Sequence, residues 1–285
     1  MLKGFIKIFS LIVFFTMTAY SQSKYAISIN YTPVLNTSVY NSVFGYNDGN
    51  SVKLDKRGLI GEMEFIAFPN TVFEILESLN ADDHFMCKVI TDDYPYKNST
   101  LFVDSRFVKL LNTKPPNRSI ENLSGDNIIS NLNSLNGLMY MWGGNTPNGI
   151  SELLDYYPPK SEISENIKNL WKLKGVDCSG LLYYATDGAT PRNTSSLVSF
   201  GDSVYVHGMN AEQISEIVQP LDLIVWDGHV VIVLDNQTTI ESTPDKGVHK
   251  SNLLSRLKYV MKDRKPVNDW NTSSGKRFVI RRWYK

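Results

Sequence analysis

Three short apolar runs between residues 223 and 242 are separated by two tight-turn signals. The runs cover residues 223–226, 229–234 and 239–242. Asp227-Gly228 joins the first two runs, and the polar stretch 235–237 joins the last two. Apolar, β-branched segments with such short polar connections predict neighbouring antiparallel strands. This stretch therefore predicts an antiparallel sheet in the second half of the chain.

Two polar side chains interrupt this apolar pattern. His229 opens the second run, and Glu241 lies in the third. With the turn centred on residue 235 the two residues face each other, and cross-strand partners lie about 5 Å apart at Cβ. Glu241 would then accept a hydrogen bond from His229 and hold the ring in one orientation. Each residue alone also suits a surface position, but together they are a candidate general base and its orienting acid.

Cys178 stands immediately before a strongly apolar segment. Residues 181–185 suit a buried helix, and Gly188 suits the end of that helix. Cys178 would then lie at the helix N-terminus, where the dipole and the free backbone N–H groups favour a thiolate. A structural cysteine is the alternative. With His229 and Glu241, a reactive Cys178 completes a Cys–His–acid arrangement for nucleophilic catalysis.

The chain ahead of these strands has helical periodicity from about residue 126. Apolar spacing predicts helices around residues 128–135, 163–171 and 214–218, and a final strand over residues 278–283. Helices followed by an antiparallel sheet predict an α+β domain.

Residues 25–110 have a different pattern. Aromatic and β-branched runs alternate with polar turns, as in residues 71–76, 84–90 and 101–104. This pattern is typical of a small all-β barrel or sandwich. Cys87 lies inside one of these runs, and we interpret it as a core residue. The Pro- and Asn-rich stretch 112–117 separates the two patterns and is the candidate linker.

The first 21 residues differ from both regions. Lys3 and Lys7 precede an apolar run, and Ala19-Tyr20-Ser21 offers small residues for cleavage. This is typical of a secretory signal peptide, and the run is short for a membrane anchor. An exported chain is free to form disulfides, so its 2 cysteines either pair or at least one stays free. Lys plus Arg and Asp plus Glu both number 29, and this balance argues against a nucleic-acid-binding protein.

Three motifs together resemble the NlpC group of papain-like cell-wall peptidases. They are Asp177-Cys178-Ser179-Gly180, Gly228-His229-Val230 and Tyr140-Met141-Trp142-Gly143-Gly144. The family places a His, an Asn or an acid twelve residues after the strand His, which is Glu241 in this chain. The resemblance covers about residues 126–285. It implies that Cys178 is the nucleophile, His229 the general base and Glu241 the orienting acid. It also implies that Tyr140 orients the cysteine or binds the oxyanion, whereas for Trp142 we expect core packing.

The resemblance also implies a set of substrate-binding residues: Asp177, Ser179, Arg192, Asn193 and Thr194. The segment from Pro191 to Thr194 is similar to one in cell-wall recycling members, which reads Pro-Arg-Asp and helps to bind the free N-terminus of the stem peptide. Asn193 replaces the acid and removes a charge partner for an ammonium group. Residues 145–174 are an insertion relative to the family, which either covers the substrate groove, the role we favour, or decorates the surface.

The N-terminal region is similar to the bacterial SH3-type domains that precede such catalytic domains, most clearly at residues 102–108. The expected organisation is a signal peptide (1–21), a small all-β SH3-type barrel (22–112), a linker (113–125) and a papain-like α+β peptidase domain (126–285).

The expected function is that of an exported thiol protease, periplasmic or extracellular, which cleaves peptidoglycan stem peptides at the bond between D-glutamate and a diamino acid. We expect a monomer that uses no metal or cofactor, binds no nucleic acid and keeps no membrane attachment after signal cleavage. Two other functions remain open on the same residues. One is an amidase or acyltransferase acting on another acyl substrate, and the other is a non-catalytic module that binds the cell wall.

Overall fold

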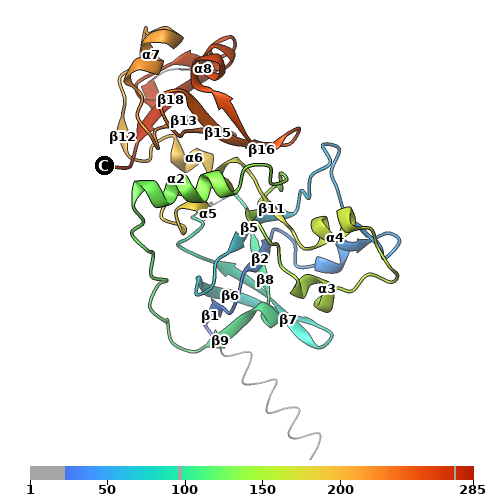
Figure 1. Cartoon of the computed structure of the whole chain (residues 1–285). Helices are drawn as coiled ribbons and strands as arrows, with labels where there is room; N and C mark the ends of the chain where they lie inside the picture. The colour runs from blue at the N-terminus through green and yellow to red at the C-terminus, as the bar shows by residue number, and fades with distance from the viewer. Residues whose placement is uncertain (1–22, 96–97, 273) are drawn as a thin grey trace, which may run out of the picture. The chain divides into compact units, whose positions relative to one another are not determined.

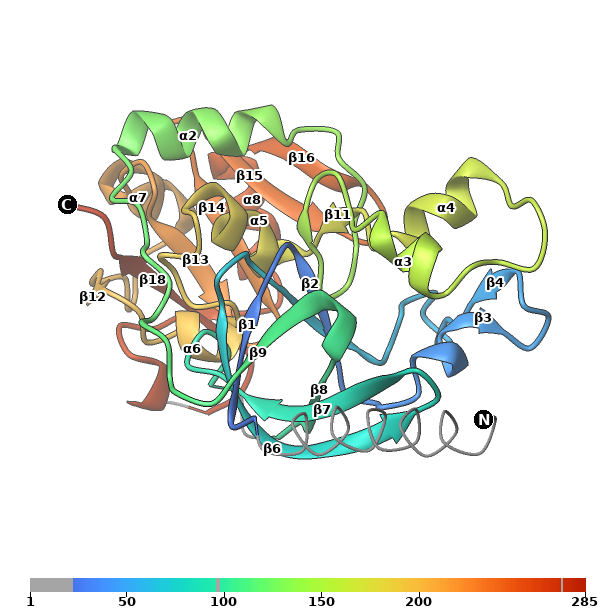
Figure 2. The ribbon, with the colours of Figure 1, turned by 90° about the horizontal axis from the view of Figure 1, so that it is seen from below.

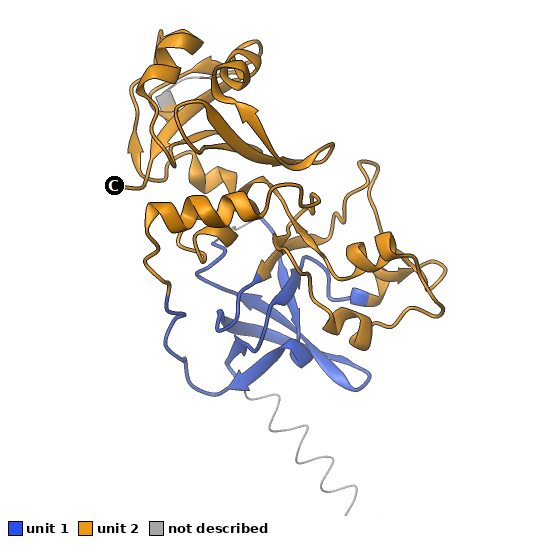
Figure 3. Ribbon diagram, viewed as in Figure 1, with its two compact units in different colours: residues 1–40, 67–119 blue, residues 41–66, 120–285 orange. Residues whose placement is uncertain are grey.

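A computed structural model describes residues 23–95, 98–272 and 274–285 (Figure 1). The chain divides into two compact units, which Figure 3 colours separately: residues 1–40 with 67–119, and residues 41–66 with 120–285. The predicted signal peptide, residues 1–21, lies outside the described residues. Within the described ranges, no helix combines the length and the apolar character needed to cross a membrane.

The first unit is built on antiparallel strands. Its strands are β1 (Tyr25–Ser28), β2 (Thr32–Leu35), β6 (Val72–Ala81), β7 (His84–Ile90), β8 (Leu101–Asp104) and β9 (Val108–Leu111), with the short 3-10 helix η2 (Ser105–Phe107) between the last two. They lie side by side in the order β2-β8-β7-β6-β1-β9. The predicted strand-and-turn pattern of this region is therefore confirmed. Its assignment to the SH3 type stays a prediction.

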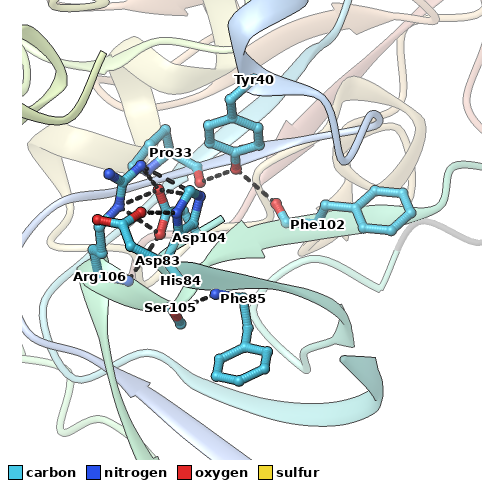
Figure 4. A network of polar contacts seen from close by, with 9 residues as sticks. All are labelled: Pro33, Tyr40, Asp83, His84, Phe85, Phe102, Asp104, Ser105 and Arg106. Carbon is cyan, nitrogen blue, oxygen red and sulfur yellow. Dashed lines mark hydrogen bonds and ion pairs between the residues drawn. The ribbon is translucent and has the colours of Figure 1, made fainter. Parts of the chain in front are cut away.

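Figure 4 shows a network of polar contacts around the Asp104 carboxylate, at the end of β8. The Asp104 carboxylate is fully buried and accepts hydrogen bonds from Arg106 Nη2 at 2.6 Å and Nε at 3.0 Å. His84 Nδ1 lies 3.0 Å from Asp83 Oδ1, and His84 Nε2 lies 3.4 Å from Arg106 Nη2. Asp104 also accepts the Arg106 backbone N–H at 2.9 Å, which caps η2. The cluster thus fixes the turn between β8 and β9 through a paired buried charge.

The second unit contains the sheet predicted around residues 223–242. Its strands are β12 (Asp202–Ser203), β13 (Leu223–Trp226), β14 (His229–Val233), β15 (Thr238–Thr243), β16 (Gly247–Asn252) and β18 (Arg277–Arg282), in the order β12-β18-β13-β14-β15-β16, with β17 (Lys265–Pro266) paired to β18. Trp226 pairs with His229 across the predicted Asp227-Gly228 turn. Gly228 has a φ of +94°, a conformation that favours glycine.

The second unit has seven helices among the described residues: α2 (Gly125–Ser134), α3 (Glu152–Tyr156), α4 (Glu165–Trp171), α5 (Cys178–Ala185), α6 (Thr194–Leu197), α7 (Ala211–Ile217) and α8 (Leu253–Met261). The predicted helices correspond to α2, α4, α5 and α7. Strands and helices are interleaved more than the predicted order of helices followed by a sheet, since β12 lies between α6 and α7 and α8 lies between β16 and β18.

The sheet of the second unit has an apolar cluster on each face. One cluster joins α2 and α5 to alternate strand residues such as Val230, Ile232 and Ile240. The other joins α7 and α8 to the intervening residues, such as Val231 and Val233. α5 packs directly against β14 and β15 (Figure 2). Burial on both faces explains why the strands are almost continuously apolar in sequence.

Residues 41–66 belong with the second unit, whereas we predicted them in the first domain. They hold β3 (Phe44–Tyr46), β4 (Ser51–Val52) and most of β5 (Met63–Ala67). Phe44 packs on Trp171, with ring centroids 6.2 Å apart, and on Tyr157, at 5.8 Å. Residues 145–174, the predicted insertion, also hold β10 (Asn145–Thr146), which pairs with β11 (Gly175–Val176). An aromatic contact between segments so distant in sequence leaves no periodic signal, so the boundary near residue 112 missed it.

Candidate active site

Cys178 is the first residue of α5, as its position before an apolar segment predicts. Asp177 caps this helix: its backbone is extended, and its Oδ1 accepts the Gly180 N–H at 2.7 Å. The first backbone N–H groups of a helix have no acceptor within it, and their partial positive charge stabilises a nearby thiolate. Cys178 is 7% exposed and forms no disulfide. Its thiol is therefore free and lies at the N-terminus of the helix.

A buried ion pair fixes the beginning of α5. Arg192 is 3% exposed and donates to both carboxylate oxygens of Asp177, at 3.0 and 2.9 Å. The same guanidinium donates to the Ser179 hydroxyl, the Asn145 side chain and the Gly144 carbonyl. Five hydrogen bonds occupy its five donors. The structure thus places Asp177, Ser179 and Arg192 in one internal network, and their predicted role in substrate binding stays a prediction.

Glycine at position 180 allows the first turn of α5 to pack closely against the backbone of Gly144. A Cβ at this position would collide with the Gly144 carbonyl oxygen, a backbone atom that has little room to move. Gly143 donates its N–H to Asp177 Oδ2 at 2.9 Å. The Gly143-Gly144 pair and the Asp-Cys-Ser-Gly motif are therefore parts of one local structure.

Tyr140 lies beside the segment that leads to Cys178. Its backbone forms a bridge with Val176, and the Met141 N–H donates to the Val176 carbonyl at 3.3 Å. Burial raises the pKa of the Tyr140 hydroxyl far above its usual range, and the negative charges of Asp177 and Cys178 raise it further. The hydroxyl therefore stays protonated and available as a hydrogen-bond donor near Cys178.

Trp142 is not a core residue, contrary to the prediction. It is 37% exposed, and the Arg57 guanidinium lies over its ring at 5.4 Å from the centroid. The following residue, Gly143, has a φ of +69°. The turn at this glycine directs the backbone N–H to Asp177 while the indole stays at the surface.

His229 occupies the start of β14, directly after the tight turn. Its Nε2 lies 2.7 Å from Glu241 Oε2, and Cys178 lies near enough to influence the pKa of the ring. The Trp226 ring lies against the imidazole, with centroids 5.1 Å apart. Burial lowers the pKa of His229. The interactions of the ring with Cys178 and Glu241, by hydrogen bonding and by charge, outweigh the effect of burial and raise the pKa to about 9.

Glu241 reaches His229 through a register different from the predicted one. Ile232 pairs with Ile240 and Val233 with Thr239, so the register is centred on residue 236 and not on residue 235. A shift of the centre by one residue moves each cross-strand partner by two, so Glu241 lies opposite Val231 and not opposite His229. Glu241 lies diagonally across from His229 on the same face of the sheet, and its side chain is long enough to reach the imidazole.

The surroundings of Glu241 include a residue that the sequence analysis missed. Glu241 is 1% exposed, and Arg256 of α8 donates to both of its oxygens, at 2.5 and 2.7 Å. Burial raises the pKa of Glu241, but the hydrogen bonds from His229 and Arg256 outweigh it and lower that pKa to about 2. Asn252, which caps α8, is the sequence signal that could have revealed this helix.

Asn193 and Thr194 lie at the start of α6. Asn193 stands at the N-cap position, and the Thr194 hydroxyl accepts the Gly228 N–H at 3.0 Å. Thr194 therefore contacts the turn that carries His229. Their role in substrate binding stays a prediction.

The geometry joins a cysteine, an imidazole and a carboxylate in series. A thiol at a helix N-terminus beside a protonatable imidazole is the arrangement that nucleophilic acyl chemistry requires. Across the described residues, no group of three or more His, Cys, Asp or Glu side chains is arranged to hold a metal ion.

Comparisons with known proteins give one match by sequence. Residues 137–263 match the NlpC/P60 family. A search of curated proteins returned no match.

Several solved structures are similar to the chain at low identity. An NlpC/P60 family protein from Bacillus cereus is 14% identical with a TM-score of 0.35, over 93% of this chain and 65% of that one. RipD from Mycobacterium tuberculosis, described as a non-catalytic NlpC/p60 domain protein adapted to peptidoglycan binding, is 21% identical with a TM-score of 0.32, over 46% and 89%. NlpC1 from Trichomonas vaginalis is 13% identical with a TM-score of 0.36, over 93% and 95%.

All three TM-scores lie below 0.5, so we draw no conclusion from the structural likeness. The family match covers the tyrosine, cysteine, histidine and acid positions together, and it agrees with the resemblance in the motifs. Residues 137–263 are an NlpC/P60 family domain.

Proposed function

We propose that this protein is an exported cysteine peptidase that hydrolyses peptidoglycan stem peptides, at the bond between D-glutamate and the following diamino acid. The observation that carries the proposal is the arrangement of Cys178, His229 and Glu241. The nucleophile lies at the N-terminus of α5, hydrogen-bonded to an imidazole that contacts a buried carboxylate at 2.7 Å. The family of the domain supports a peptidase that acts on peptidoglycan.

In the proposed reaction, the Cys178 thiolate attacks the carbonyl carbon of the scissile amide. His229, which holds the proton from the thiol, returns it to the leaving amine as the carbon–nitrogen bond breaks and a thioester forms. Water then attacks the thioester with His229 as general base, and the thiolate leaves. Glu241 holds the ring so that Nε2 faces the carboxylate.

The oxyanion formed in each step needs donors in the protein. The backbone N–H of Cys178 has no acceptor within α5 because this residue begins the helix. The Tyr140 hydroxyl, which stays protonated, is the second proposed donor. Two fixed donors stabilise the transition state more than the planar carbonyl.

A set of defined stem peptides tests this function. The mature chain, residues 22–285, is mixed with peptides that carry a free or a blocked N-terminus, with and without the glycan, and the products are weighed by mass spectrometry. We expect cleavage after D-glutamate, with a gain of one water, and none by Cys178→Ala. Preference for a free N-terminus would show that Asn193 still permits recycling-type recognition.

The two alternative functions give different products. Transfer to another acceptor adds the mass of that acceptor instead of water. A wall-binding module retains sacculi and releases no peptide. Full activity in Cys178→Ala contradicts the proposed mechanism.

A further inference from the structure

The Glu241 carboxylate is bound side-on by a guanidinium from α8. Arg256 donates from Nε to Oε1 at 2.5 Å and from Nη2 to Oε2 at 2.7 Å. Both partners are enclosed: the side chain of Glu241 is 2% exposed and that of Arg256 is 15% exposed. Two parallel charge-assisted bonds fix the plane of a carboxylate as well as its position.

One carboxylate oxygen serves both Arg256 and His229. Glu241 Oε2 lies 2.7 Å from Arg256 Nη2 and 2.7 Å from His229 Nε2. Rotation of the carboxylate would therefore break the bond to His229 and both bonds to Arg256 at once. The side chain of Arg256 also lies over the Tyr259 ring, at 5.3 Å from the centroid, which limits its own rotamers.

We propose that Arg256 is a positioning residue of this site, which holds Glu241 ionised and oriented toward His229. The inference rests on the proposed function for its catalytic consequence. The contacts that carry it stand independently of the substrate. No substrate atom is required to contact Arg256.

The charges around His229 determine the direction in which its pKa should change when the charge of Arg256 is removed. The titratable and charged groups around His229 and Glu241 come from four elements: Cys178 from α5, Glu241 itself from β15, His249 from β16 and Arg256 from α8. His249 Nε2 lies 3.8 Å from Glu241 Oε1. The thiolate, imidazolium, carboxylate and guanidinium together are neutral. Removal of the guanidinium leaves an excess negative charge in a buried site. Protonation of His229 then becomes more favourable, so its titration moves to higher pH.

The test uses the mature protein with two substitutions and one matched control. Arg256→Gln removes the charge, and Arg256→Lys keeps it while losing the side-on geometry. Lys258→Gln is the control, because Lys258 lies on the same helix and pairs with an exposed acid, Glu212, at 2.6 Å. Each variant is read in two ways: stem-peptide kcat/KM, and the pH titration of His229 followed by NMR.

We expect Arg256→Gln to lower kcat/KM by about 10- to 100-fold and to move the titration of His229 to higher pH. Arg256→Lys should lower kcat/KM with that titration unmoved, and Lys258→Gln should change neither. In a Glu241→Gln background, Arg256→Gln should cause little further loss, because Arg256 acts through that carboxylate.

Two results would overturn the inference. One is an Arg256→Gln protein whose NMR titration of His229 matches that of the wild type, even with reduced activity, since a purely structural residue would behave in this way. The other is a full additional loss in the Glu241→Gln background. If no peptide is cleaved by any form, the proposed function fails, whereas the NMR readout still decides the role of Arg256.

Discussion

Each unit of the molecule contains a buried cysteine, a buried carboxylate, an arginine and a histidine. In the first unit they are Cys87, Asp104, Arg106 and His84, and in the second they are Cys178, Glu241, Arg256 and His229. Both carboxylates accept at least two hydrogen bonds from their arginine. The same residue types thus occur in one chain with different arrangements.

The two cysteines differ in the backbone that carries them. Cys87 lies inside β7, where burial raises the pKa of its thiol to about 11 and the charge of Asp104 adds to the effect, against a hydrogen bond with Ser78. Cys178 begins a helix and is hydrogen-bonded to an imidazole. A strand interior offers no free N–H groups of the kind found at a helix N-terminus. Composition alone therefore does not make a reactive site.

The two histidines differ in what their nitrogens face. His84 Nδ1 contacts the exposed Asp83, and its Nε2 lies 3.4 Å from Arg106 Nη2 and 3.7 Å from Asp104 Oδ2. His229 Nε2 lies much closer to its buried carboxylate, 2.7 Å from Glu241 Oε2, and the ring also interacts with Cys178. Of the two arrangements, the second brings an imidazole to both a close carboxylate and a thiol.

Substitution of each cysteine should give the largest contrast. We expect Cys178→Ala to lower turnover of stem peptides by more than about 1000-fold, because the nucleophile is lost. Cys87→Ala should keep kcat/KM within about twofold and lower the free energy of unfolding by about 1 kcal/mol, since it leaves a small cavity. Peptide kinetics and thermal unfolding of both variants measure this. Equal loss of turnover in the two proteins would remove the distinction.

Alkylation should separate the cysteines without any substrate. With a pKa of about 11, Cys87 is a thiolate in roughly one molecule in ten thousand at pH 7. We expect iodoacetamide to modify Cys178 at least about 100-fold faster, as measured by peptide mapping over time. The folded Cys178→Ala protein is the control for slow labelling of Cys87. Comparable rates at both positions would mean that helix position and the imidazole do not activate Cys178.

The two buried acids should affect different properties. Glu241→Gln should slow turnover by about 100-fold while the fold is kept, because the amide presents a less favourable partner to the imidazolium. Asp104→Asn should lower the free energy of unfolding by about 1–3 kcal/mol, because it weakens the buried ion pair with Arg106. Turnover should be unchanged, because this ion pair lies in the first unit. Kinetics and denaturant unfolding of each variant give the comparison. A slow Asp104→Asn enzyme with normal stability would contradict it.

The sequence allowed the places of Cys178 and His229 in the fold to be predicted better than the contacts around Glu241. The Asp227-Gly228 hairpin and the apolar segment after Cys178 depend on local chemistry, so β13, β14 and α5 lie where the patterns predict. Arg256 reaches Glu241 by tertiary packing of α8, which the periodicity did not reveal. The position of residues 41–66 depends likewise on contacts between distant segments, such as Phe44 with Trp171.

The surface position of Trp142 and the register of β15 were missed for more local reasons. A single indole in an apolar motif suggests burial, but the turn at Gly143 leaves it 37% exposed. A polar turn gives no direct measure of its own length, so the register was centred one residue too early. The face of the strand was nevertheless correct, because side chains alternate with a period of two and the long Glu241 side chain spans a diagonal.

The pH dependence of turnover gives the finest distinction between the two clusters. The pKa of His229, raised to about 9 from its ordinary 6.5, means that the imidazolium persists at neutral pH and is lost as the pH rises through about 9. Without that proton the leaving amine has no general acid, so the rate should be half-maximal near pH 9 on the alkaline side. Glu241→Gln removes one of the causes that raise this pKa, so its alkaline limb should move to lower pH. Asp104→Asn, which alters only the first unit, should leave the limb in place. Profiles of kcat/KM from pH 5 to 10 for the three proteins measure this, and an unmoved limb in Glu241→Gln would show that the carboxylate does not set the protonation of His229.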